Sequence, residues 1–233
     1  MEYINNWQKD LNRKNSLTLI ILFIFLFACY EYILFSRLSS RRHLDKAFIH
    51  LEKARFVNKE IIVEKLLLYQ KALKFLRNAM RLNSYDARPY FEFAQVISEI
   101  RSDSELANSL DIKSLSGWQE QEQDDKGFYN LAKANYIEAI LREPTNPIYH
   151  QRLGSIYDKL SYAENAEKEF NKAVLLDPQN LMLHLYLSRY FYIKDRQTEF
   201  LKHLNKTLDL YKVLPRSPFH EKVEEFLRKI DYH

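Results

Sequence analysis

Glycine and proline are so scarce in this sequence that few folds other than helical ones are open to it. Its 233 residues contain three glycines and six prolines. No proline precedes Pro89 and no glycine precedes Gly117. Tight turns, β-bulges and phosphate-binding loops depend on these two residue types. Because hydrophobic residues reach 46% and charged residues 28%, the composition is that of a folded protein, and we expect an all-α fold.

An apolar run near the N-terminus predicts a membrane-spanning helix. Residues 17–35 read LTLIILFIFLFACYEYILF, nineteen positions with Glu31 as the one charge. A helix of that length spans roughly 28 Å, about the thickness of the bilayer core. A buried helix of a soluble protein keeps a polar stripe, and residues 20–28 have none on any face. We therefore expect a polar tail over 1–15, a transmembrane helix over 16–36 and a single-pass membrane protein.

The processing and the orientation of this run stay open. Residues 26–29 (LFAC) are similar to a lipoprotein processing site, where Cys29 would be lipidated and the preceding residues removed. Three Lys or Arg residues precede the run and six follow it within twenty residues, a count that leans toward a cytoplasmic body. Arg13 and Lys14, however, lie directly before the run, which is typical of a signal anchor that holds its tail inside.

The strongest internal signal is a period of 34 residues, the distance from Pro144 to Pro178. The segment 147–180 has small, large and proline residues at spaced positions, namely Leu153, Gly154, Tyr157, Ala166, Phe170, Ala173 and Pro178. It resembles a tetratricopeptide repeat (TPR), in which two antiparallel helices pack closely through small residues and the next pair stacks on them.

Capping residues predict where the two helices of this segment begin. Asn146 before Pro147 is a typical N-cap followed by a first-turn proline. Ser161 and Glu164 have the spacing of a capping box, which we expect to open the second helix.

Weaker copies of the pattern flank this segment. Residues 181–214 read as a divergent repeat, and 215–233 as a C-terminal capping helix. Residues 87–146 read as a repeat with an insertion at about 101–126, and 37–86 as a stalk with a degenerate first repeat. The predicted fold class is thus all-α, a TPR-type α-solenoid of helix-turn-helix repeats preceded by one transmembrane helix.

The insertion has two possible roles. Residues 102–126 contain seven acids, two lysines and Trp118. Trp is enriched at interface hot spots, so Trp118 is a candidate for partner contact. The alternative, which we favour, is a mobile acidic loop in which Ser102 and Glu105 open a short helix and Trp118 folds back on the solenoid.

No motif in the sequence indicates catalysis. Phosphate loops, nucleophile elbows, Cys-x-x-Cys pairs and His-Glu-x-x-His helices are missing. His150 and His184 lie 34 residues apart, but no cysteine or paired carboxylate completes a metal-ligand set, and we expect both to be packing residues. The net charge of +4 is spread along the chain. We expect no enzyme, cofactor, metal, nucleic acid or small-molecule substrate.

The resemblance to TPR proteins implies a groove for a protein partner. The first helices of successive repeats line the concave face in that family. The corresponding partner-binding positions here are Phe91, Gln95, Gln151, Ser155, Asp158, Leu185, Arg189 and Tyr192. They lack the lysines and asparagines with which chaperone-binding members hold a C-terminal carboxylate, so we expect an apolar and aromatic groove for a helix or an extended peptide. Several of them, Leu185 and Tyr192 especially, could instead pack inside the solenoid.

We interpret the chain as a membrane-anchored TPR scaffold or adaptor that supports assembly or stability of a membrane-associated complex. It most resembles single-pass proteins of the bacterial inner membrane. The alternatives are a constitutive structural subunit of a larger membrane complex and a bacterial lipoprotein with a TPR body. Further alternatives are a mitochondrial outer-membrane import receptor and an accessory to a polysaccharide-synthesising enzyme.

Overall fold

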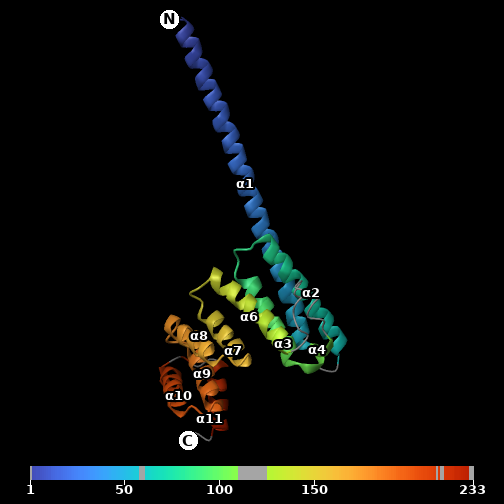
Figure 1. Cartoon of the computed structure of the whole chain (residues 1–233), viewed down its shortest axis with the longest axis vertical. Coiled ribbons are helices and arrows are strands. Elements are labelled where there is room, and N and C mark those ends of the chain that lie inside the picture. The colour runs from blue at the N-terminus through green and yellow to red at the C-terminus, as the bar shows by residue number, and fades with distance from the viewer. Residues whose placement is uncertain (1, 58–60, 110–124, 214, 216–217, 231–233) are drawn as a thin grey trace. The chain divides into compact units, whose positions relative to one another are not determined.

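The computed structural model describes residues 2–57, 61–109, 125–213, 215 and 218–230, with side chains of the first helix from Ile21 onward. Every regular element in these residues is a helix, which confirms the predicted fold class (Figure 1). The chain divides into two compact units, Met1–Pro89 and Tyr90–His233. The helices are α1 (Glu2–Phe56), α2 (Ile62–Leu82), α3 (Arg88–Ser102), α4 (Ser104–Ser109), α6 (Asp125–Arg142), α7 (Pro147–Lys159), α8 (Ala163–Leu176), α9 (Leu181–Ile193), α10 (Gln197–Val213) and α11 (Pro218–Lys229).

The first unit begins with one long helix. α1 runs from Glu2 to Phe56 without a break, because it contains neither glycine nor proline. Its described part reaches a mean hydropathy of 1.8 over a window in which no residue is buried. Large side chains there are solvent-exposed, as Phe23 is at 71%. A membrane anchor and a signal sequence share this length and composition.

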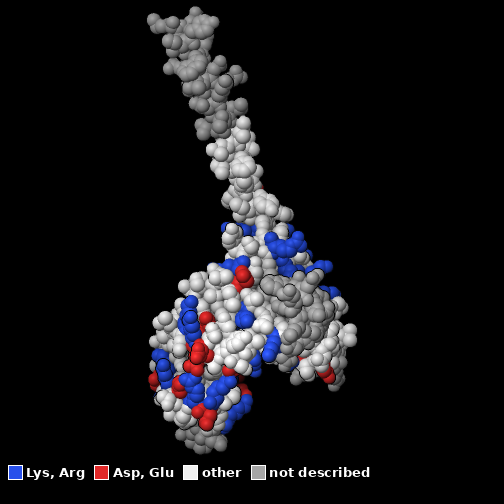
Figure 2. Space-filling model, viewed as in Figure 1, with Lys and Arg blue, Asp and Glu red and all other residues white. Residues whose placement is uncertain are grey.

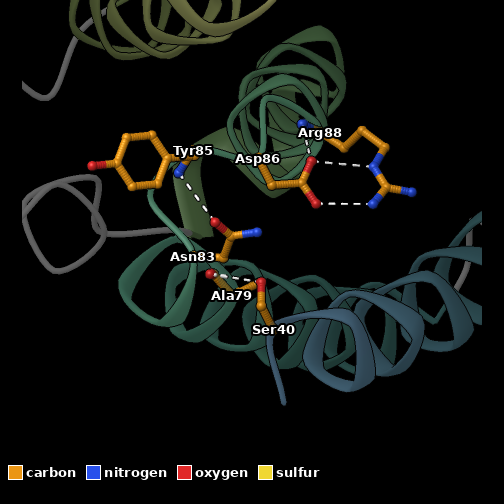
Figure 3. Close-up of polar contacts among 6 residues, drawn as sticks. All are labelled: Ser40, Ala79, Asn83, Tyr85, Asp86 and Arg88. Atoms are coloured by element: carbon orange, nitrogen blue, oxygen red, sulfur yellow. Dashed lines mark hydrogen bonds and ion pairs between the residues drawn. The ribbon is translucent and has the colours of Figure 1, made fainter. Parts of the chain in front are cut away.

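The second half of α1 packs against α2 as a helical hairpin. The buried residues recur at helical spacing on both helices and are Leu44, Ala47, Leu51, Ala54, Tyr69, Ala72, Leu73, Leu76 and Ala79. Ser40 Oγ donates a hydrogen bond of 2.9 Å to the carbonyl of Ala79 and joins the two helices (Figure 3). The helix that runs out of the apolar segment therefore also forms one side of the first helical pair.

In the second unit, α7 and α8 form a closely packed pair. Asn146 caps α7, since its Oδ1 accepts a hydrogen bond of 3.1 Å from Ile148 N, and Pro147 is the first helical residue. Gly154 lies against the ring of Phe170, and a Cβ placed on this glycine would lie 2.6 Å from Phe170 Cε1. The missing side chain therefore sets the distance between the two helices.

The capping box predicted at Ser161 is not formed. α8 begins at Ala163, and its N-cap residue, Tyr162, makes no side-chain capping bond. Ser161 instead has a φ of 64° and ends α7 in the left-handed conformation, with Tyr162 N donating to Tyr157 O at 2.8 Å. Asp195, 34 residues later, has a φ of 54° and ends α9 in the same way. These residues thus terminate first helices and do not start second ones.

The start of the short helix predicted in the insertion is also different. Ser102 is the last residue of α3, and its Oγ donates a hydrogen bond of 2.8 Å to Ser98 O. Asp103 accepts from Leu106 N at 3.3 Å and so takes the capping position of α4. The one-residue shift arises because an aspartate lies between the two serines and caps at least as well as either.

A single apolar cluster joins α8 to α11. Phe170 of α8, Leu185 of α9, Leu204 of α10 and Val223 of α11 are each at most 1% exposed. A buried side chain of this size contributes about 1.5–3 kcal/mol, so α11 is held by its apolar face. This packing is what a capping helix at the end of a solenoid requires.

Buried histidines repeat a contact every 34 residues. His150 Nε2 donates to the carbonyl of Pro144 at 3.0 Å, and His184 Nε2 donates to that of Pro178 at 3.1 Å. The second ring nitrogen of His150 lies 2.6 Å from Glu169 Oε2. The prediction that the two imidazoles only pack was therefore incomplete, since each ties a first helix to the loop that precedes it.

In the next repeat, a histidine takes the place of the carboxylate. His184 Nδ1 lies 3.0 Å from Nδ1 of His203, which is 34 residues after Glu169. Because His184 donates through Nε2, its Nδ1 accepts and His203 donates, and both rings are neutral in this arrangement. Burial first, and then the nearby His184 and Lys202, lower the pKa of His203 to about 4.

We predict that Gly154→Ala destabilises the full-length protein. The added methyl group meets Phe170, which is 1% exposed and has little room to move. The expected loss of unfolding free energy is about 1–3 kcal/mol. Thermal unfolding followed by circular dichroism measures it, with Asn171→Ala on the exposed side of α8 as the control. Equal melting temperatures for the two variants would contradict the close helix approach.

We also predict that acid destabilises the α9–α10 pair. The folded pKa of His203 lies below its unfolded value of about 6.5, so the unfolded state binds more protons between these values. The contribution of neutral His203 to the free energy of unfolding is therefore fully present above about pH 6.5. It falls by about 3 kcal/mol as the pH drops from there through 4. Urea unfolding at several pH values gives the free energy of unfolding at each pH. Its decrease with falling pH should be smaller for His203→Gln than for the unaltered protein. An equal decrease in both proteins would contradict this assignment.

Candidate partner-binding groove

Two neighbouring cavities lie in the second unit. They measure about 410 and 470 Å³ and share Arg152 and Tyr186. We call them together the groove. The first is lined by Gln95, Ser98, Glu99, Ser102, Tyr129, Tyr136, Arg152, Ser155, Ile156, Lys159 and Tyr186. The second is lined by Ile148, Gln151, Arg152, Asn180, Met182, Leu183, Leu185, Tyr186 and Arg189.

The 34-residue period explains which residues line the groove. Arg152 on α7 corresponds to Tyr186 on α9, and Ser155 corresponds to Arg189, each 34 residues later. Equivalent positions of stacked first helices lie side by side, so they form one surface. Tyr186 Oη lies 2.6 Å from Ser155 Oγ and joins the two helices across this surface.

Three predicted residues line the groove and have side chains that reach its surface. Gln95, Gln151 and Ser155 are all half-buried. Gln95 donates a hydrogen bond of 3.0 Å to Glu99 one turn further along α3. The first helices thus supply polar side chains to the groove.

Two further predicted residues line the second cavity, but one packs in the apolar core and the other contacts α11. Leu185 is 1% exposed and belongs to the apolar cluster of α8–α11. Arg189 donates a hydrogen bond of 3.0 Å to the carbonyl of Lys222, and its guanidinium lies over the ring of Phe226. Leu185 therefore follows the packing alternative, and Arg189 holds α11 in place.

The remaining predicted residues lie outside the lining of the two cavities. The ring of Phe91 stacks on that of Tyr149 with centroids 4.6 Å apart. Asp158 accepts a hydrogen bond of 3.2 Å from Tyr190 of α9. Tyr192 packs against rings of α10 and α11. All three connect helices of the solenoid, so a packing role explains them.

The groove is more polar than the sequence indicated. Glu99, Arg152 and Lys159 bring charges that the predicted set did not contain. Arg152 and Lys159 are exposed, and neither forms an ion pair within the described part of the chain. Burial raises the pKa of the Tyr136 and Tyr186 hydroxyls, so both phenols stay protonated. The groove fits a peptide with acidic or carbonyl groups better than a purely apolar one.

Sequence reasoning missed Arg152, Lys159 and Tyr186 because the family pattern that it followed assigns other positions of the first helices to the concave face. A signal was nevertheless available, since Arg152 and Tyr186 are 34 residues apart and lie next to the predicted Gln151 and Leu185. A long polar side chain beside a predicted groove position can reach the same cavity.

Two other predicted sites are not resolved by the geometry. Trp118 lies outside the described residues. Cys29 is a half-exposed residue inside α1, and its lipidation stays a prediction. Within the described ranges, no three His, Cys, Asp or Glu residues gather as a metal site would require.

A family model for the tetratricopeptide repeat matches residues 148–180. Residues 148–180 form a tetratricopeptide repeat. No protein of curated function matches the sequence. TPR domains typically act as non-enzymatic scaffolds for protein–protein interaction, and this repeat contributes α7, α8 and much of the groove.

The solved structure of human IFIT1 agrees with this assignment at the level of the fold. The human IFIT1 dimer with PPP-AAAA is 17% identical, with a TM-score of 0.53 over 77% of this chain and 40% of that one. MamA is 17% identical, with a TM-score of 0.46 over 64% of this chain and 78% of that one. The Arabidopsis OM64 TPR domain is 17% identical, with a TM-score of 0.45 over 72% of this chain and 98% of that one. The match to IFIT1 spans less than half of the length of that protein.

We predict that a core substitution lowers the free energy of unfolding much more than substitutions of exposed groove residues do. Leu185→Ala should lower the unfolding free energy by about 2–5 kcal/mol, because it leaves a cavity in the core. Arg152→Glu combined with Lys159→Glu should change it by less than about 0.5 kcal/mol, because both side chains are exposed. Urea unfolding of the full-length protein measures both. A strongly destabilised charge variant would show that these residues support the fold.

Proposed function

We propose that the chain is a membrane-anchored TPR scaffold that binds a protein partner in the groove. In this role it supports the assembly or stability of a membrane-associated complex, with the bacterial inner membrane as its expected location. The observation that carries the proposal is the continuity of α1. The same helix is an exposed apolar rod in its first part and one side of a packed hairpin in its second.

The exposed part of α1 supports the anchor. A soluble protein rarely leaves a contiguous row of large apolar side chains in water, and those of α1 are more than half exposed from Ile21 to Phe27. The bilayer core is the environment in which such a helix is stable without a protein partner.

The groove supports the binding role. It combines the Tyr186 hydroxyl of α9, half-buried amides of α3 and α7, and two unengaged cations of α7. This mixture suits an extended or helical segment that offers backbone carbonyls and acidic side chains. Arg152, at the junction of the two cavities, is the central contact in this proposal.

Recovery of partners from native membranes tests the binding role. The tagged full-length protein with Arg152→Glu and Lys159→Glu should recover at least about tenfold less partner than the unaltered protein, because reversed charges repel an acidic segment. Lys168→Glu with Lys172→Glu changes the charge equally on the exposed side of α8 and should recover partner normally. Equal recovery by both variants would exclude the groove.

The same preparation tests the anchor and separates adaptor from subunit. Resistance of the full-length chain to carbonate extraction supports a retained anchor, whereas release into the soluble fraction contradicts it. A partner that stays bound at fixed stoichiometry indicates a constitutive subunit. A partner that exchanges with added free protein indicates an adaptor.

A further inference from the structure

Positive charge is concentrated in the segment that directly follows the apolar part of α1. Residues 37–89 contain thirteen Lys and Arg against five Asp and Glu. Residues 90–233 contain nineteen Lys and Arg against 23 acids. Figure 2 shows Lys and Arg gathered where the apolar part of α1 ends. Basic residues in this position are attracted to anionic lipid headgroups.

The end of α2 returns to this same point of α1. Ser36 Oγ donates a hydrogen bond to the carbonyl of Leu82, and Ser40 Oγ donates to Ala79 O four residues further along α1. These bonds hold Arg81 beside Arg37, which follows the last residue of the apolar run by two positions. A cavity of about 220 Å³ lies between them, entirely within the first unit.

The two arginines are available for an anionic ligand. Arg37 and Arg81 are exposed, and neither makes an ion pair with a residue that the structure describes. The nearby carboxylate of Asp86 is already engaged, since Arg88 donates to it at 3.2 and 2.9 Å (Figure 3). Glu31 precedes Arg37 by six residues and lies about 240° around the helix, on another side.

Two tyrosines complete the rim of this cavity. Tyr32 is 74% exposed and Tyr85 is 86% exposed. Tyr85 is held by its loop, because its backbone N–H donates to Asn83 Oδ1 at 3.3 Å, and Figure 3 shows its ring extending away from Asp86. Tyrosines are enriched at the level of the headgroups, where the ring contacts acyl chains and the hydroxyl stays in water.

We propose that this cavity binds the headgroup phosphate of an anionic phospholipid. The site rests on the proposed membrane anchor, which places Arg37 at the level of the headgroups. The forked guanidinium groups of Arg37 and Arg81 bind the phosphate oxygens, and the two tyrosines border the upper acyl chains. The bound lipid fixes the first helical hairpin against the membrane surface.

Native mass spectrometry of the full-length protein in detergent tests the site, with phosphatidylglycerol and phosphatidylcholine as probes. We expect retention of phosphatidylglycerol over phosphatidylcholine. Arg37→Gln with Arg81→Gln should weaken phosphatidylglycerol binding at least about tenfold. The control, Lys53→Gln with Lys71→Gln, removes equal charge from the cavity at the other end of the hairpin and should weaken binding less than about twofold.

Several results would overturn the proposal. Equal weakening by the two double variants would show diffuse attraction and no site. Equal retention of the two lipids, or displacement of the lipid by millimolar inorganic phosphate, would also exclude a lipid headgroup site. If the arginine variant loses helicity, Tyr85→Ala replaces it, and unchanged binding by that variant would contradict the site. Carbonate extraction of the unaltered protein reports separately on the anchor, and the groove variants report on partner binding.

Discussion

The continuity of α1 is the constraint on which the rest of the first unit depends. A helix of 55 residues with no glycine or proline has no built-in point at which to bend. Its apolar part and the part that packs on α2 therefore belong to one uninterrupted helix. The two serine bonds from α1 to the end of α2 fix the hairpin at the boundary between these parts. The packed hairpin is therefore continuous with the apolar part of α1 and is not joined to it by a linker.

In the second unit, the corresponding constraint is the 34-residue period. It places equivalent side chains next to one another on successive first helices, and it does so in the core, at helix ends and in the groove. His150 and His184 each bond a preceding proline carbonyl, and Ser161 and Asp195 each end a first helix. Where the period is kept but the residue type differs, the side-chain contact at that position differs too. The Glu169 carboxylate beside His150 becomes His203 beside His184, and the contact between these two histidines is one that acid weakens.

Much of the fold could be predicted from the sequence, because glycine scarcity and helical spacing act locally. The N-cap at Asn146 was predicted correctly for this reason. The capping box at Ser161 was wrong, because the end of the preceding helix competed for the same residue. The groove was predicted only in part. Gln151 lies where expected, whereas Leu185, 34 residues later, is buried because α8 to α11 close over it. Burial depends on elements distant in the sequence, which a repeat pattern alone does not encode.

We propose that α1 is a single helix that crosses from the bilayer into the first helical hairpin. Cysteine accessibility tests it most directly. Single cysteines placed along 21–56 in a Cys29→Ser background are treated in native membranes with an impermeant maleimide applied to both faces. We predict no labelling over 21–35. Beyond 35, labelling should follow the helix, strong at Arg41 and Asp45 and weak at Leu44. Labelling within 21–35, or an even pattern beyond it, would contradict the claim.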